Sequence, residues 1–218
     1  MGEKNLPLMG LFVVFEGVEG SGKSTQSRAL KRRLTRSGYP STLVREPGST
    51  PTGERIGRWL KSGHDVTPLA ELLLFSAARA SLVESIIRPA LRNSEIVVCD
   101  RYIYSTLAYQ GYGRGLDMNV IRHLNEITTG GLLPHLVVLL DLPPEEGLAR
   151  KEGKPLDRIE REKADFHQRV RQGYLRLAQH EPERWLVLNS AESRASLSES
   201  IWGRVSQMLN KGEIPASK

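Results

Sequence analysis

One short segment constrains this chain more than any other. Residues 17–24 read Gly-Val-Glu-Gly-Ser-Gly-Lys-Ser, which matches the pattern GxxxxGK followed by Ser or Thr. The segment follows an apolar run, Leu11 to Phe15, that is typical of a β-strand, and it precedes a helical pattern. Glycines let the backbone curl so that several N–H groups converge on one anion, where the positive end of the next helix adds its field. The segment therefore predicts a phosphate-binding loop between a strand and a helix.

The residue types in this loop predict separate tasks. We expect Lys23 to reach the β- and γ-phosphates of a nucleoside triphosphate, and Ser24 to offer its hydroxyl to Mg²⁺, which prefers hard oxygen ligands. The expected ATP-binding residues are Gly17, Gly20, Ser21, Gly22, Lys23, Ser24 and Thr25. Motors, switches, transport ATPases and small-molecule kinases share such a loop, so the rest of the chain must decide the use of the nucleotide.

Short apolar runs alternate with longer helical patterns along the 218 residues. The runs predict strands at Leu11–Phe15, Thr42–Arg45, Ile96–Cys99, Leu136–Leu140 and Trp185–Leu188. This alternation predicts an α/β fold with a five-stranded parallel sheet and helices on both faces, because right-handed crossovers need covering helices. The length fits one domain, 1–218, with tails at about 1–9 and 211–218. Ligands of such a sheet bind beyond the carboxyl ends of its strands.

The clearest helical pattern runs from Pro68 to Ile87, with Thr67 as its cap. Phe75 and Arg79 lie one turn apart, so both can point into the same cleft. The predicted core stripe of this helix is Leu72, Leu73, Ala77, Ala80, Val83 and Ile87.

Composition excludes several other classes. One cysteine, Cys99, rules out an intrachain disulfide framework, and the five histidines show no zinc-site spacing. No apolar stretch approaches the roughly 20 residues that cross a bilayer. We therefore expect a cytoplasmic protein without a membrane partner.

The net charge of +6 raises the alternative of a nucleic-acid-binding ATPase. The one tight basic triplet, residues 31–33, is typical of a solvated helix face, and the basic residues lack interleaved aromatic residues, so no nucleic-acid partner is expected. A GTP-dependent switch is disfavoured as well, because no DxxG segment follows the loop and Asn210–Glu213 only approximates NKxD.

Four further segments follow the loop. They are Arg45-Glu46-Pro47-Gly48, Leu72-Leu73-Leu74-Phe75, Asp100-Arg101-Tyr102 and Leu156-Asp157-Arg158-Ile159-Glu160. Together with the loop, and in this order, they resemble the bacterial thymidylate kinase family over about residues 11–191. The resemblance implies a P-loop kinase that transfers the γ-phosphoryl group of ATP to dTMP, giving dTDP and ADP for dTTP synthesis. It also implies a homodimer.

Carried over position by position, the resemblance implies roles for single residues. Phe75 stacks on thymine, Arg79 donates to a base carbonyl, Thr106 reads the thymine edge and Tyr109 lies against the deoxyribose. Arg45 and Arg101 clamp the dTMP phosphate, and Glu19 lies near the sugar 3′-hydroxyl. The full dTMP-binding set is Glu19, Arg45, Phe75, Arg79, Arg101, Ser105, Thr106, Tyr109 and Gln110.

The resemblance also implies a short lid at about residues 149–158. The expected catalytic residues are Lys23, Arg101, Glu19 and the lid arginines Arg150 and Arg158, with Lys151 and Lys154 as further candidates. Asp100 is expected to orient Mg²⁺ through water. The remaining alternative is a P-loop kinase that acts on another nucleotide or on a deoxynucleoside.

Overall fold

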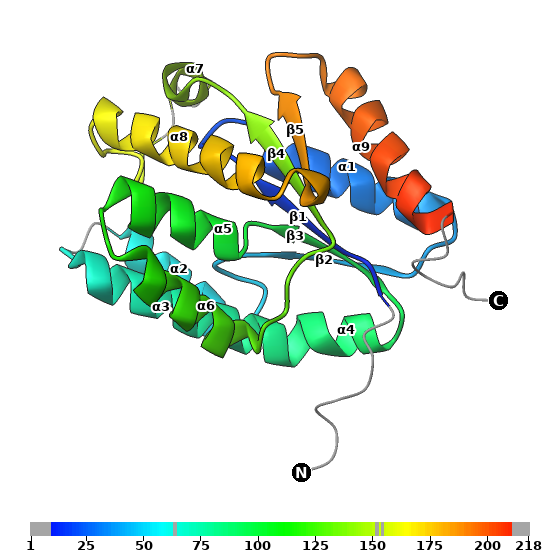
Figure 1. The fold of residues 1–218 in the computed structure, drawn as a ribbon, viewed down its shortest axis with the longest axis horizontal. Coiled ribbons are helices and arrows are strands. Elements are labelled where there is room, and N and C mark those ends of the chain that lie inside the picture. Colours follow the sequence, from blue (N-terminus) through cyan, green and yellow to red (C-terminus); the bar gives the residue numbers. More distant parts are fainter. Residues whose placement is uncertain (1–9, 63–64, 151–152, 154, 211–218) are drawn as a thin grey trace, which may run out of the picture.

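A single parallel sheet organises the computed structural model, which describes residues 10–62, 65–150, 153 and 155–210. Its strand order is β2-β3-β1-β4-β5, and all neighbouring strands pair in parallel (Figure 1). The strands are β1 (Phe12–Glu16), β2 (Ser41–Arg45), β3 (Ile96–Asp100), β4 (Leu136–Asp141) and β5 (Trp185–Asn189). The predicted parallel sheet is confirmed, and every strand boundary lies within one residue of the predicted run. The predicted tails lie outside the described residues, as do Lys151 and Lys154 of the predicted lid.

Helices cover both faces of this sheet, as predicted. Helices α1 (Lys23–Arg36) and α9 (Arg194–Asn210) lie side by side on one face (Figure 1). The other face carries α3 (Pro68–Leu82), η1 (Val83–Ile87), α4 (Arg88–Arg92), α5 (Ile103–Thr106), η2 (Leu107–Gly113), α6 (Met118–Thr129) and α8 (Ala164–His180). Helix α2 (Pro51–Lys61) packs on α3, while α7 (Pro144–Ala149) and the short η3 (Pro182–Arg184) connect the later elements.

Two apolar cores lie on either side of the sheet, because successive strand residues point to opposite faces. In β1, Val13 and Phe15 pack with Leu30 and Leu34 of α1, whereas Phe12 packs on the opposite face. All five residues of β1 are buried, which explains why the sequence shows a continuous apolar run there instead of an alternating one. Within the described residues, no helix combines the length and the apolar character needed to cross a membrane.

Helix α3 begins as predicted, because the Thr67 side chain accepts a hydrogen bond from the Ala70 N–H and Pro68 occupies the first turn. The predicted core stripe is wrong at Leu73, which is 48% exposed, and at Ala77, which is also exposed. The buried face includes Ser76 and Arg79 instead. The leucine and alanine residues of this helix are distributed over several of its sides. The hydrophobic pattern therefore did not define which face of the helix turns inward.

Candidate active site

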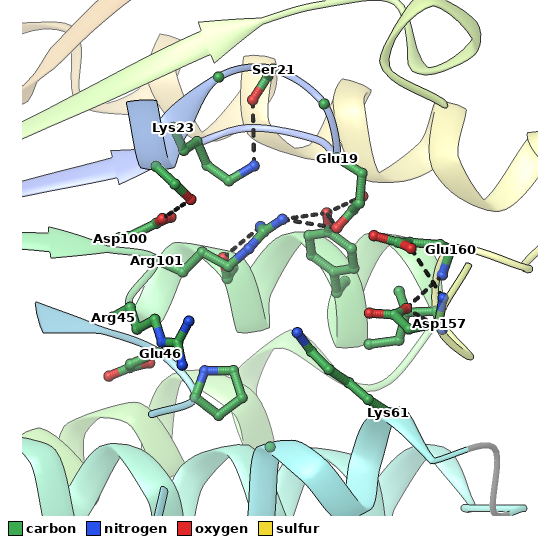
Figure 2. A pocket seen from close by; sticks show the side chains of 18 of the residues that line it. Glu19, Ser21, Lys23, Arg45, Glu46, Lys61, Asp100, Arg101, Asp157 and Glu160 are labelled. Atoms are coloured by element: carbon green, nitrogen blue, oxygen red, sulfur yellow. Dashed lines mark hydrogen bonds and ion pairs between the residues drawn. The ribbon is translucent and has the colours of Figure 1, made fainter. Parts of the chain in front are cut away.

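A cavity of about 960 Å³ lies at the carboxyl ends of the strands, between the phosphate-binding loop and helices α2 and α3. Figure 2 shows Lys23 and Ser21 on one side of it and Arg45 and Lys61 on the other. The cavity brings together most of the predicted residues, namely Glu19, Gly20, Ser21, Gly22, Lys23, Ser24, Thr25, Arg45, Phe75, Arg79, Asp100, Arg101, Ser105, Thr106, Tyr109, Gln110 and Arg150. Two predicted residues, Gly17 and Arg158, are not part of its lining.

The loop holds Lys23 in a buried position. Its ammonium donates to the carbonyl oxygens of Gly17, at 2.9 Å, and Val18, at 2.7 Å, and to the Ser21 hydroxyl at 3.3 Å. Burial, reinforced by the Arg101 guanidinium, lowers the pKa of Lys23 to about 8, although Glu19 and Asp100 act in the opposite direction. The lysine is therefore poised to gain stabilisation from an anion that enters the cavity.

The loop also approaches its neighbours so closely that side chains are excluded. Gly20 has a positive φ of 72°, and a Cβ atom there would lie 2.0 Å from the Gly147 carbonyl oxygen in α7. A Cβ atom on Gly147 would in turn lie 2.1 Å from the Glu19 carbonyl oxygen. The backbone contact between the loop and α7 thus requires glycine on both sides, and Gly147 is a residue that the motif did not predict.

Ser24 and Asp100 come together where α1 begins and β3 ends. The Ser24 hydroxyl donates a short hydrogen bond to the Asp100 carboxylate. The pair offers two hard oxygen donors beside the phosphate-binding loop, a donor set that suits Mg²⁺. Within the described residues, no group of three or more His, Cys, Asp or Glu side chains is arranged to hold a metal.

Arg101 links the loop to the far side of the cavity. Its guanidinium donates to the Glu19 carboxylate at 2.8 Å, to the Gly17 carbonyl at 3.1 Å and to the hydroxyls of Ser105 and Tyr109 at 3.2 Å each. Burial disfavours the charged form, but Tyr109 and Glu19 outweigh it and raise the Arg101 pKa. Arg101 also has a positive φ of 73°, a conformation that costs a non-glycine residue about 1 kcal/mol. The surrounding contacts hold this residue in a defined place.

A buried carboxylate behind Arg101 was missed by the sequence analysis. Glu16, the last residue of β1, accepts hydrogen bonds from the backbone of Tyr102 at 2.9 Å and from the hydroxyls of Ser105 at 2.6 Å and Tyr174 at 2.8 Å. Burial raises the Glu16 pKa, and Arg101 opposes this rise. A carboxylate that ends an otherwise apolar strand was a visible signal for such a role.

Arg45 extends from the end of β2 toward the same space (Figure 2). Its guanidinium donates to Glu54 of α2 at 3.0 Å, and its backbone N–H donates to the Ser49 hydroxyl at 3.0 Å. The Arg45 side chain remains largely exposed to the cavity. Arg45 and Arg101 therefore present two guanidinium groups to one region, a suitable arrangement for a phosphate.

The resemblance implies that Arg79 donates to a base carbonyl, but in the structure its donor nitrogens already have protein partners. It is 2% exposed and donates to Glu46, Thr106, Asn125 and the Tyr102 carbonyl oxygen. These contacts engage Nε and both terminal nitrogens, so a ligand carbonyl must share a donor that already has a protein partner. Burial raises the pKa of Glu46 to about 7, with Arg79 opposing the shift. Phe75, one turn before Arg79, lines the cavity.

The cavity continues past the loop to a second end that the sequence analysis did not predict. Gln26, Ser190, Glu192, Arg194 and Leu197 line this end together with Arg150. Arg150 donates to the Ser190 carbonyl oxygen at 3.1 Å and to the Gly20 carbonyl oxygen at 3.3 Å. Ser190 directly follows β5, so its position at the carboxyl end of a strand was the available signal.

Arg158 turns away from the cavity, although its neighbours line it. Asp157, Ile159 and Glu160 form part of the wall, whereas the Arg158 guanidinium pairs with Glu71 of α3 through a short contact. The two predicted lid arginines therefore lie apart, with Arg150 beside the loop and Arg158 against α3.

Comparison with known proteins identifies the family. The family model described as thymidylate kinase matches residues 15–201. A thymidylate kinase of Dehalococcoides mccartyi is 47% identical over 203 residues, covering 92% of this chain and 98% of that protein. One from Deinococcus radiodurans is 49% identical over 201 residues, covering 91% and 97%. The crystal structure of thymidylate kinase from Ehrlichia chaffeensis superposes with a TM-score of 0.74 at 32% identity, covering 90% of this chain and 98% of that one. The chain belongs to the thymidylate kinase family.

Proposed function

We propose that this chain transfers the γ-phosphoryl group of ATP to dTMP, giving dTDP and ADP. The observation that carries the proposal is one continuous cavity in which Arg45 lies across from the phosphate-binding loop, and Arg101 lies between them, bonded to Glu19 of the loop. A donor triphosphate and an acceptor monophosphate then meet end to end. Family membership, the relatives named thymidylate kinase and the position of Phe75 support dTMP as the acceptor.

The acceptor is held at three points. Arg45 and Arg101 bind its phosphate, Phe75 offers a flat apolar face to the base, and the Arg79–Thr106 pair lies beside it. Tyr109, whose hydroxyl donates to Glu19 at 2.7 Å, would lie against the sugar and leave little space for a 2′-hydroxyl. The wall therefore favours a deoxynucleotide.

Transfer needs positioning and charge stabilisation more than proton removal. A phosphate monoester with a second pKa of about 6 is largely dianionic at neutral pH, so its oxygen attacks without a strong base. Lys23 stabilises charge on the transferring group from the loop side, and Arg101, oriented by Glu19, does so from the acceptor side. Lys23 is buried and Arg101 is mostly shielded from solvent, which strengthens their effect on the reacting atoms.

We also propose Mg²⁺ as the metal that accompanies ATP. The Ser24 hydroxyl would bind it directly, and Asp100 would hold one of its water ligands. Bound Mg²⁺ would neutralise part of the charge on the β- and γ-phosphates. The contact between Ser24 and Asp100 keeps both oxygen donors on the side of the loop that faces the cavity.

The second end of the cavity would take the donor nucleoside. The planar Arg150 guanidinium, held by Ser190 and Gly20, offers a face on which an adenine ring can stack, and Leu197 adds an apolar surface. In this arrangement Arg150 contributes to donor binding and lies next to the loop that binds the phosphates.

A coupled ADP-release assay with Mg-ATP tests the function. We expect ADP with dTMP and much less with dCMP, AMP or thymidine, and dTDP by mass spectrometry. A preference for another acceptor would favour the alternative of a different P-loop kinase. ADP release that needs no acceptor but rises with DNA or RNA would favour a nucleic-acid-dependent ATPase.

Two further assignments accompany this function. The single thiol, Cys99, is free and buried in β3, which supports a reducing, cytoplasmic setting. A homodimer is supported by exposed apolar side chains on the neighbouring helices α3 and α6, namely Leu69, Leu73, Val120 and Ile127. Exposed apolar side chains on two neighbouring helices offer a surface on which a second copy of the chain could pack.

Sedimentation of Leu73→Glu tests the homodimer. We expect a shift from dimer to monomer with an unchanged circular dichroism spectrum, because the new carboxylate would be buried at the interface. Val187→Glu is the matched control, since Val187 is 45% exposed on β5, away from α3 and α6. A wild-type monomer would refute the assignment.

A further inference from the structure

Glu71, in the first turn of α3, is a buried carboxylate to which the proposed mechanism assigns no task. It is 1% exposed, yet it accepts hydrogen bonds from three long side chains. Gln110 donates to it at 2.8 Å, Arg114 donates at 3.2 Å to each carboxylate oxygen, and Arg158 forms a short ion pair with it. Burial raises the pKa of Glu71, but hydrogen bonds from Arg114 and Arg158 outweigh it and leave the pKa lowered. Glu71 is therefore ionised at neutral pH and accepts hydrogen bonds from all three side chains at once.

Arg158 connects Glu71 to the wall of the active-site cavity. The flanking residues Asp157, Ile159 and Glu160 face the cavity, and Arg158 points the other way, toward α3. The Arg158 guanidinium also donates to the Leu60 carbonyl oxygen of α2 at 3.3 Å. The segment from Asp157 to Glu160 is thus tied to both helices that form the far side of the cavity.

This segment is a compact turn that its own hydrogen bonds hold together. The Asp157 carboxylate accepts hydrogen bonds from the backbone N–H groups of Ile159 and Glu160, at 3.0 Å each, and the Asp157 N–H donates to the Glu160 carboxylate at 3.0 Å. Figure 2 shows Asp157 and Glu160 together at the edge of the cavity. Because the turn is internally bonded, the contact of Arg158 with Glu71 sets the position of the whole turn.

The same carboxylate orients Gln110. A carboxylate only accepts hydrogen bonds at neutral pH, so the Gln110 atom that faces Glu71 is the amide nitrogen. Gln110 lines the cavity next to Tyr109 in η2. Glu71 therefore contacts Gln110 in the cavity wall and, 48 positions later in the sequence, Arg158, whose neighbours line the same wall.

We propose that Glu71 is a positioning residue for acceptor binding, which holds the Asp157–Glu160 turn through Arg158 and the amide of Gln110 directly. The proposal rests on the proposed phosphoryl transfer to dTMP. It assigns to Arg158 the role of an anchor, in place of direct contact with the transferring phosphoryl group.

A double-mutant cycle on KM and kcat tests this role. Arg158→Met and Glu71→Gln both break the contact between Arg158 and Glu71, and Glu71→Gln also alters the contacts with Gln110 and Arg114. Each is expected to raise KM for dTMP about tenfold or more while kcat falls less than about threefold. The double variant is expected to match Glu71→Gln within about twofold, because the contact with Arg158 is already lost in that variant. KM for ATP should change little, because the donor end lies on the other side of the loop.

Arg171→Met is the matched control. Arg171 pairs with Asp141 at 2.8 Å and does not line the cavity, so the control removes an arginine from an ion pair elsewhere. We expect KM for dTMP within twofold of wild type. Melting curves identify any variant that fails to fold. Arg158 is partly exposed, so Arg158→Met tests the anchor even if Glu71→Gln unfolds.

Two results would overturn the role of Glu71. A kcat loss of 100-fold or more in Arg158→Met, with Glu71→Gln close to wild type, would make Arg158 a catalytic residue. Variants that melt at lower temperature but keep the wild-type KM would show a structural role alone. A wild-type protein that releases no ADP with dTMP would overturn the proposed function itself, and the positioning role with it.

Discussion

Replacing Lys23 by Met is expected to abolish transfer and stabilise the empty protein. The Lys23 pKa of about 8, against 10.5 for an ordinary lysine, means that the folded state disfavours the charged form by about 3 kcal/mol at pH 7. Methionine removes this cost, and it also removes hydrogen bonds to Gly17 and Val18 that contribute about 1 kcal/mol in total. The expected net gain is about 2 kcal/mol, or a rise in Tm of about 4–8 °C for a chain of this size.

The pH dependence separates this cause from a general packing effect. Between pH 8 and 10.5 the unfolded state binds a proton at Lys23 that the folded state has lost, so wild-type stability rises with pH. The advantage of Lys23→Met should therefore shrink above pH 8 and be gone by about pH 10. Urea unfolding without ligand at pH 7 and pH 9.5 measures both values.

An exposed lysine provides the control for this experiment. Lys61→Met, at the end of α2, removes a charge that is already solvated and should change stability by less than about 0.5 kcal/mol. A Lys23→Met protein that is less stable than wild type at pH 7 would refute the reasoning. So would an advantage that stays the same at pH 9.5.

Three other predictions follow from the site. Phe75→Ala should raise KM for dTMP about 10- to 100-fold with little change in KM for ATP, because stacking on a base contributes about 1–3 kcal/mol. Equal changes in both KM values would contradict the placement of Phe75 against the thymine base. Gly147→Ala should raise KM for ATP, because the new Cβ would lie 2.1 Å from the Glu19 carbonyl oxygen, whereas Gly203→Ala, which meets nothing within 4 Å, should behave as wild type in the same assay. Chelation with EDTA should stop ADP release but leave dTMP binding by calorimetry intact, and Ser24→Ala should need more Mg²⁺ for half-maximal activity; a chelated protein that still transfers phosphate would exclude the metal role.

Local patterns in the sequence determined the strands, the loop and the start of α3. Each depends on residues close together in the chain: an apolar run, a glycine-rich segment before a helix, or Thr67 and Pro68 at an N-terminus. The family resemblance added the acceptor residues, and the cavity contains each of them, from Glu19 to Gln110. Apart from Phe75 and Arg79, which lie on α3, these groups are close to strand ends, where a parallel sheet gathers ligand-binding residues at one edge.

Only the tertiary structure decided which way individual side chains turn. Leu73 faces outward because α3 is apolar on several sides and the packing of α2 and α6 selects its buried face. Arg158 turns from the cavity because Glu71, 87 positions earlier, offers a buried carboxylate. The donor nitrogens of Arg79 already have protein partners, because Glu46, Thr106 and Asn125 converge on this side chain from three separate segments. A charged side chain adopts the orientation in which its buried donors find acceptors, and those acceptors are distant in sequence, so no local pattern contains them.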